Sequence, residues 1–381
     1  MTAGGTVANI YYCQPLLGAI ADTFRVGSDV ATHVAAATQL GLAAGFLLLV
    51  PLGDSFERKR LIVGTTALSA VTLSLVALSP SIHWMIAASG LMGLICVTPH
   101  FVVPYAAAAV SPERRGRTVG TVMSGLLIGI LLSRTLSGSI GAHAGWRAVF
   151  WLAAAGMLVL ATVLALALPP QAPARRVPYC ELVGSLWTLL FTEPVLRRHA
   201  LIGAAGMGAF SAFWTTLTFH LANLPAHYGS ETAGLFGLVG AAGALAAAGA
   251  GRIADRVGPR PLNGAALVLI VGSFGLMGFS GHSLVALSIG VILMDAGVQA
   301  SHISNQTRIY ALAAEMRNRL NGVYMVIYFL GGAAGSDLGS LAWEHYGWPG
   351  VCAAGAAFGC IGLVALFALK SSTGHQPNAT N

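Results

Sequence analysis

Long apolar stretches separated by short polar segments occupy almost the whole chain. A stretch of about 20 apolar residues is long enough to cross a bilayer as a helix. Stretches of this kind begin near residues 3, 31, 61, 83, 118, 148, 199, 230, 262, 283, 320 and 349. The pattern therefore predicts an all-α membrane protein with twelve transmembrane helices, six in each half of the chain.

The composition supports this prediction. Of the 381 residues, 56% are apolar and only 9% are charged, and the mean hydropathy is +0.75, which is not the composition of a soluble domain. The five cysteines are odd in number and have no metal-site spacing. No Lys or Arg precedes Arg25, as one would in a cleaved signal peptide. We expect neither a metal nor a cofactor.

The net charge of +7 follows from membrane topology. If the amino terminus lies in the cytoplasm, 16 of the 20 Lys and Arg residues fall in cytoplasmic loops or the tail. This asymmetry sets the orientation of membrane proteins, so the charge does not require a nucleic-acid partner. We expect a multi-pass protein of the inner (plasma) membrane, surrounded by lipid, with both termini in the cytoplasm.

A repeat relates the two halves of the chain. Asp54 and Asp255 are 201 residues apart, whereas the segments SPERRGR and AAEMRNR, and the Gly-Trp pairs at Gly145 and Gly347, are 202 residues apart. Recurrent spacing of this kind is typical of secondary transporters. The same spacing places the first turn of helix 1 before Met1, so we expect that helix to be clipped.

The repeat divides the chain into four parts. We predict two six-helix halves at 1–168 and 199–370, a cytoplasmic linker at 169–198 and a cytoplasmic tail at 371–381. The linker contains five prolines and four arginines. Leucines at helical spacing between Glu181 and Phe191 predict a helix that lies along the membrane surface.

One loop carries a family resemblance. The stretch GRIADRVGPR resembles the loop between helices 2 and 3, repeated between helices 8 and 9, of the major facilitator superfamily of secondary transporters. The first copy, VPLGDSFERK, keeps Asp54, Arg58 and Lys59, but both glycines are lost and a serine replaces the arginine after the acid. The resemblance implies the two-half fold of that family and a gating role for the loops. The predicted gating residues are Asp54, Arg58, Gly251, Asp255, Arg256, Gly258 and Arg260.

Two further segments resemble parts of this family. The phrase NIYYCQPLL is similar to the first helix of its bacterial sugar or drug efflux branch. Gly120, Gly129 and Gly138 keep the spacing of the glycine-rich helix 5 motif associated with antiporters, but Arg134 replaces its kinking proline. Small residues at this period let helices approach closely. The arginine is a departure from the motif.

Arg134 lies deep in the membrane, about 16 Å from the outer end of its helix. A permanent cation there needs an anion or water, and Asp295 and Asp337 lie at comparable depth. We predict that Asp295 carries protons, because helix 10 lines the cavity in the family. Asp337 is predicted to be the closer partner of Arg134, because helices 5 and 11 occupy equivalent places in the two halves.

Other polar residues interrupt the apolar stretches. Amides, phenols and imidazoles in a membrane helix need a partner or a cavity, so they either hydrogen-bond between helices or line a pathway. His100 and His302 occupy equivalent positions in the repeat and could relay protons or simply pack in the bundle. The remaining predicted pathway residues are Asn9, Tyr12, Gln14, Trp214, His220 and Gln299.

These observations predict a secondary active transporter that works by alternating access, with a small-molecule substrate, proton-coupled efflux of a sugar or drug, and a monomeric state. The chain has no GxxxxGK[ST] loop of an ATP-driven pump and no HExxH or GxSxG motif of an enzyme. Two alternatives stay open. One is a transport-dead membrane sensor on the same fold, and the other is substrate uptake by proton symport.

Overall fold

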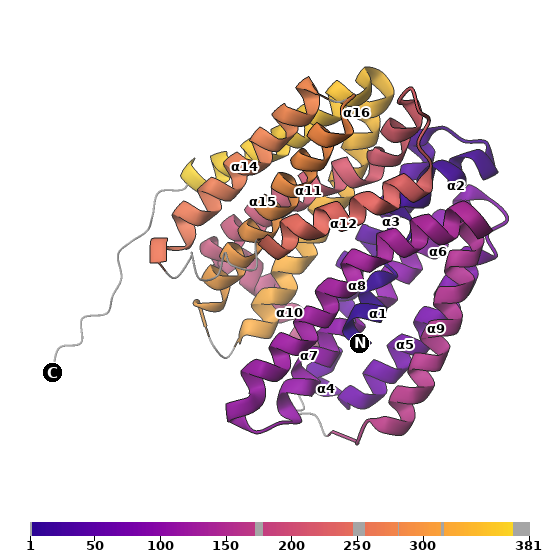
Figure 1. The fold of residues 1–381 in the computed structure, drawn as a ribbon. Helices are drawn as coiled ribbons and strands as arrows, with labels where there is room; N and C mark the ends of the chain where they lie inside the picture. The colour runs from indigo at the N-terminus through magenta and orange to yellow at the C-terminus, as the bar shows by residue number, and fades with distance from the viewer. Residues whose placement is uncertain (1, 172–177, 247–255, 281, 314–315, 369–381) are drawn as a thin grey trace.

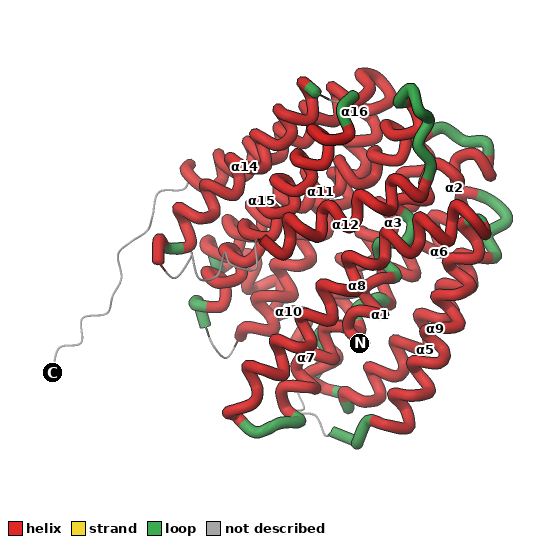
Figure 2. The backbone as a smooth tube through the Cα atoms, in the orientation of Figure 1, coloured by secondary structure: helices red, strands yellow, loops and turns green. Residues whose placement is uncertain are grey.

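The computed structural model describes residues 2–171, 178–246, 256–280, 282–313 and 316–368. All regular secondary structure in these segments is helical (Figure 2). The helices before the linker are α1 (Thr2–Ala8), η1 (Gln14–Leu16), α2 (Leu17–Phe24), α3 (Ser28–Leu48), α4 (Leu52–Ser55), α5 (Arg58–Ala77), α6 (Ile82–Ile95), α7 (Thr98–Ala108), η2 (Pro112–Arg114), α8 (Arg115–Ala144) and α9 (Trp146–Ala167). Those that follow are α10 (Tyr179–Thr192), α11 (Pro194–Asn223), α12 (Ser230–Ala246), α14 (Pro259–Phe279), α15 (Leu284–Tyr310) and α16 (Arg317–Ala368).

These helices are consistent with twelve membrane crossings. Nine helical stretches in the described residues are long and apolar enough to span a bilayer. One of them, α16, is 52 residues long and contains a kink, so it supplies two crossings. The first crossing consists of the short pieces α1, η1 and α2, and the eighth contains α12.

The repeated Gly-Trp pairs make equivalent turns. Gly145 separates α8 from α9 with φ 80°, and Gly347 kinks α16 with φ 61°. Residues with a side chain rarely adopt these angles. The duplication seen in the sequence is therefore also present in the backbone, where both turns reverse the chain between the last two crossings of a half.

Two crossings are interrupted in the first half. Residues 9–13 form turns between α1 and η1 rather than a regular helix. In η1, just after these turns, the Pro15 carbonyl oxygen accepts a 3.5 Å hydrogen bond from the Thr218 hydroxyl. The fourth crossing breaks between α6 and α7, just before Pro99. A second proline, Pro104, lies inside α7.

The two halves lie side by side, coloured indigo to magenta and pink to yellow in Figure 1. They meet where α8 packs against α12 and where α3 packs against α16. Within each half, small residues allow close packing: a methyl group at Gly129 would overlap Gly4, and one at Gly331 would overlap Ala204. Gly120 has no such neighbour, so only part of the glycine-rich motif is used for helix contact.

The linker helix is present but differs from the prediction. Leu182, Leu186 and Leu189 of α10 are buried against the protein, while Trp187 and Phe191 are exposed and stack on each other. The helical spacing of the leucines was correctly recognised. Its cause is packing on the bundle, and the aromatic residues are the ones that remain free to meet a membrane surface.

Candidate functional site

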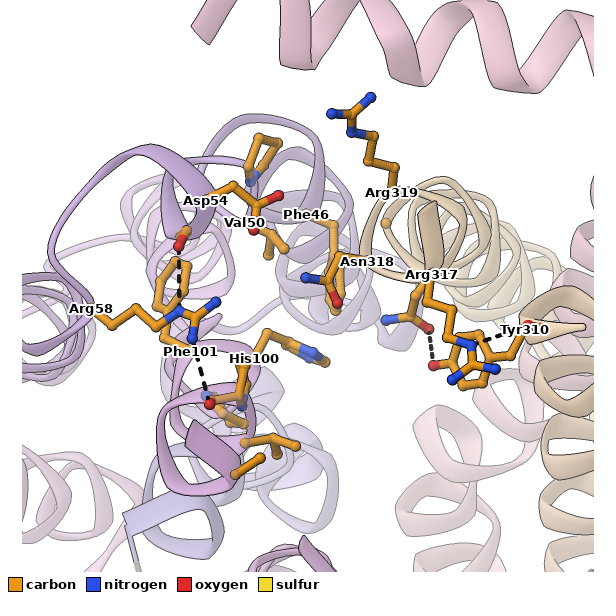
Figure 3. Close-up of a pocket in the computed structure, with 18 of the residues that line it drawn as sticks. Phe46, Val50, Asp54, Arg58, His100, Phe101, Tyr310, Arg317, Asn318 and Arg319 are labelled. Atoms are coloured by element: carbon orange, nitrogen blue, oxygen red, sulfur yellow. Dashed lines mark hydrogen bonds between the residues drawn. The ribbon is translucent and has the colours of Figure 1, made fainter. Parts of the chain in front are cut away.

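A cavity of about 690 Å3 lies between the two halves (Figure 3). It is found at the end of the bundle that carries Arg58, Arg117 and Arg319, which we call the basic end. Its wall comes from α3, α4, α5, α7 and α8, from the linker helix α10, and from α15 and α16. The polar lining residues are Asp54, Arg58, His100, Gln306, Tyr310, Arg317, Asn318, Arg319 and Asn321.

The charged residues of the cavity are mostly basic. The wall contains three arginines, Arg58, Arg317 and Arg319, and a single acid, Asp54. Arg58 donates a 3.5 Å hydrogen bond to the Pro104 carbonyl oxygen, and Arg317 donates to a backbone carbonyl of α15. Within the described part of the chain neither arginine forms an ion pair with Asp54. The arginines therefore keep their charge available, and a cleft lined by one sign of charge attracts ligands of the other sign.

A second group of polar residues is buried within the bundle around Arg134 on α8. This residue is 2% exposed, and its Nε donates a 2.7 Å hydrogen bond to Gln14 Oε1. Its guanidinium carbon lies 4.1 Å from the ring centre of Trp214, 4.6 Å from that of Tyr11 and 5.3 Å from that of Phe210. Each such cation–π contact contributes about 0.5–2 kcal/mol. Together they offset part of the cost of burying a cation.

Asp295 on α15 joins this group through the Trp214 indole, whose Nε1 donates a 3.4 Å hydrogen bond to Oδ1. The acid is 5% exposed, yet it forms no direct ion pair with Arg134. A methyl group at Gly240 of α12 would overlap the carboxylate and lie 2.9 Å from the indole, so α12 closes the group from one side. We call Tyr11, Gln14, Arg134, Phe210, Trp214 and Asp295 the central cluster.

The central cluster brings together four residues predicted from the sequence and two that were missed. Phe210 could have been found, because it lies four residues before Trp214 and therefore on the same face of α11. Tyr11 could not. The chain around it forms turns rather than a helix, and helical spacing gives no guide to which of two adjacent tyrosines faces inward.

The predicted pairing of Arg134 with Asp337 is wrong. The Asp337 carboxylate lies 3.9 Å from His33 of α3, and both side chains are about half exposed. The reason is the packing of the helices. The α8 helix packs against α1 and α12, whereas α16 packs against α3 and α11, so the two equivalent helices present these residues to different neighbours.

His100 and His302 share an aromatic stack but no hydrogen bond joins them. The His100 ring lies 4.3 Å from the Phe46 ring, and His302 accepts or donates a 2.9 Å hydrogen bond at Tyr324. Between them the rings of Phe46 and Phe329 are 5.5 Å apart. The contacts of the two histidines are aromatic packing and, for His302, the hydrogen bond with Tyr324. A proton relay between them stays a prediction.

The other predicted pathway residues lie outside the cavity wall and the central cluster. His220 is buried and stacks on Trp348 at 3.9 Å, in the core of the second half. Asn9 is fully buried, and its amide has no hydrogen-bond partner in the protein. Tyr12 and Gln299 are half buried.

The gating loops are described only in part. Gly251 and Asp255 lie outside the described residues. Arg256 is exposed, Arg260 is half buried in the first turn of α14, and Gly258 precedes that helix with φ 85°. At the same end of the bundle, a hydrogen bond from the Ser111 side chain lowers the pKa of the exposed Glu113.

Metal binding has no candidate here. Across the described ranges, no group of three or more His, Cys, Asp or Glu residues has the arrangement of a metal site. The central cluster itself offers one carboxylate and one amide oxygen among aromatic rings and an arginine. A guanidinium repels metal cations, so this group is suited to anions or protons.

Two solved structures resemble this fold. The nucleoside transporter NupG matches with a TM-score of 0.77 and 14% identity, over 96% of this chain and 98% of that one. A bacterial homologue of the human lysosomal transporter Spinster, in an inward-facing and occupied conformation, matches with a TM-score of 0.72 and 14% identity, over 96% and 93% of the two chains. At these identities the likeness concerns the fold alone.

Relatives and a family model extend the likeness to the sequence. A transporter of Escherichia coli K12, YgaY, is 44% identical over 364 residues, covering 96% of this chain and 92% of that protein. The probable transporter SCO4007 of Streptomyces coelicolor is 36% identical over 362 residues, covering 94% and 84%. Residues 3–336 match the model of the Major Facilitator Superfamily. The chain is therefore a multi-pass membrane protein that belongs to the Major Facilitator Superfamily of transporters.

Proposed function

We propose that this protein is a secondary transporter that works by alternating access and exports a small solute in exchange for protons. In this proposal the protein is a monomer of the inner membrane. The basic end faces the cytoplasm, and so do both termini. The solute enters the cavity from that end and reaches the central cluster before the opposite end opens.

The observation that carries the proposal is the cavity at the basic end, because both halves line it. Toward the opposite end the halves are in contact. The Thr135 hydroxyl donates a 3.0 Å hydrogen bond to the Gly234 carbonyl oxygen, and the Ser230 hydroxyl donates to Gly138. A cleft open at one end and closed at the other is the arrangement that alternating access requires.

The contact between α3 and α16 also favours a conformational change. Gln39 Oε1 and the hydroxyls of Ser336 and Ser340 are buried without a hydrogen-bond partner in the protein. A buried polar group without a partner costs about 1–3 kcal/mol. Opening of this contact would let the three groups bind water. The free-energy cost of burying them unpaired would then be lost, which makes opening easier.

Asp295 is the proposed proton carrier. It is the single acid of the central cluster, and an acid buried inside a transporter helix bundle is a usual element of a proton pathway. Its neighbour Trp214 lies against Arg134, which belongs to the first half and is bonded there to Gln14. A proton on Asp295 can therefore change how the cluster holds a solute.

Proton-coupled uptake is the second candidate, and one feature of the cluster favours it. Asp295 and any negative group bound to Arg134 are stabilised by the same positive charge, and the two negative charges repel each other. Protonation of Asp295 would then favour binding of that group, and proton and solute would move in the same direction.

The test is transport by the purified protein in proteoliposomes, with a panel of sugars, organic acids and drugs. Export by proton exchange predicts that a solute leaves the compartment into which protons flow. Accumulation of solute together with protons would instead establish uptake. Binding of solutes without flux under any gradient would contradict both candidates and favour a sensor.

A further inference from the structure

Arg134 has binding capacity that the protein itself does not use. The side chain is 2% exposed. Its Nε is bonded to Gln14, but its Nη2 is buried without a hydrogen-bond partner in the protein. A guanidinium offers five N–H donors in a planar fork that fits a carboxylate with two parallel bonds. The cluster contains one carboxylate, Asp295, and it is not paired with this fork.

The surroundings of Arg134 suit an organic body attached to that carboxylate. The rings of Tyr11, Trp214 and Phe210 lie against the guanidinium. Aromatic walls with a few fixed polar groups are the usual lining of sites for small organic molecules. A simple inorganic anion would bind the arginine but would not use the apolar surface of these rings.

The route from the cavity carries the same sign of charge. Arg58, Arg317 and Arg319 outnumber the one acid of the cavity wall. On α8 the cavity wall reaches Leu126, which lies eight residues before Arg134 and therefore about 12 Å away along the helix. A solute that enters the cavity would thus meet basic residues first and a buried guanidinium further in.

We infer that Arg134 is the anion subsite of the transported solute, and that the substrate class is a small organic anion with an apolar or aromatic body. This inference rests on the proposed function as a secondary transporter, and an anionic solute bound to Arg134 favours its second candidate, proton-coupled uptake. The Gln14 amide holds the guanidinium in place at Nε, the rings bind the organic body, and the substrate carboxylate occupies Nη2.

Binding of radiolabelled phenylacetate to the full-length protein in lipid nanodiscs tests the inference. The comparison ligand is phenylacetamide, which has nearly the same shape and no charge. We expect phenylacetate to bind at least about tenfold more tightly, as a hydrogen-bonded charge pair requires. Absence of phenylacetate binding at millimolar concentration, or equal binding of the two ligands, would overturn the inference.

Two variants locate the subsite. Arg134→Gln should abolish the preference for the charged ligand. Gln14→Glu places a carboxylate beside Nε, where it should form an ion pair with Arg134. This internal pair should neutralise the charge that binds phenylacetate, and so remove phenylacetate binding without loss of thermal stability. The matched control is Arg147→Gln, because Arg147 also lies over an aromatic ring, Trp146, at 4.2 Å. A preference that survives both central variants, or is lost equally in the control, would refute the assignment.

This experiment separates the inference from the proposed function, since binding is measured without a gradient. If the protein binds phenylacetate through Arg134 but transports no solute, the anion subsite is supported and the proposed transport function is refuted. A protein that moves neutral solutes and ignores carboxylates keeps transport and contradicts the anion subsite.

Discussion

Gly240 offers a precise way to disturb the central cluster from a helix that carries none of its residues. A methyl group at this position would overlap Asp295 Oδ2 and lie 2.9 Å from Trp214 Cζ2. Both neighbours are buried and are joined by a hydrogen bond. Gly240→Ala should therefore displace the carboxylate or separate α12 from α15.

The expected size of this effect follows from two opposing contributions. Overpacking a buried site costs about 1–3 kcal/mol, whereas Gly→Ala inside a helix stabilises by up to about 1 kcal/mol. We expect a net loss of about 0–3 kcal/mol in stability. Proton-driven transport should be strongly reduced even where the loss of stability is small, because the added methyl group displaces the carboxylate of Asp295, the proposed proton carrier.

The control is Gly206→Ala. Gly206 is also buried, lies in a helix of the same half, and has no atom near the position of the added methyl group. It should show the helix stabilisation alone and full transport. The assays are thermal unfolding in nanodiscs and proton-driven flux in proteoliposomes. If Gly240→Ala matches Gly206→Ala in both assays, the described packing around Asp295 is incorrect.

Two further predictions concern residues outside the central cluster. Because no hydrogen bond joins the histidines, His100→Gln and His302→Gln should each keep the pH profile of transport between about 6 and 8; a flattened profile in both variants would support the proton relay instead. The half-exposed pair of His33 and Asp337 joins α3 to α16 and should contribute about 0.2–1 kcal/mol. Asp337→Asn should therefore raise the fraction of molecules in which α3 and α16 are separated near this pair by up to about fivefold. Distances between spin labels on the two helices measure this fraction, and unchanged distances would mean that the pair has no gating role.

The fold could be predicted from the sequence because it depends on features that can be seen along the chain, namely the lengths of the apolar stretches and the spacing of the repeat. Apolar stretches of sufficient length set the crossings, and the repeat set the two halves. Gly145 and Gly347 were matched by spacing alone, and both adopt the same kind of turn. The breaks in the first crossing were not foreseen, because the polar residues at positions 9–13 were interpreted as lining a pathway or bonding between helices and not as a sign of irregular backbone.

The site was predicted less completely, because helix neighbours are set in three dimensions. Burial depth correctly identified Arg134 and Asp295 as candidates for one cluster. The choice of Asp337 as partner failed because equivalence in the repeat does not imply contact: α8 meets α12, while α16 meets α3. Phe210 was within reach of a helical-face argument, whereas Tyr11 depends on irregular backbone.

The central claim is that Asp295 couples protons to solute movement, and Asp295→Asn tests it most directly. The control is Asp22→Asn, an exposed acid at the end of α2. In proteoliposomes, Asp295→Asn should lose proton-driven transport but retain counterflow of a transported solute, because exchange needs no net proton movement. The control should retain both. Normal proton-driven transport in Asp295→Asn would contradict the account.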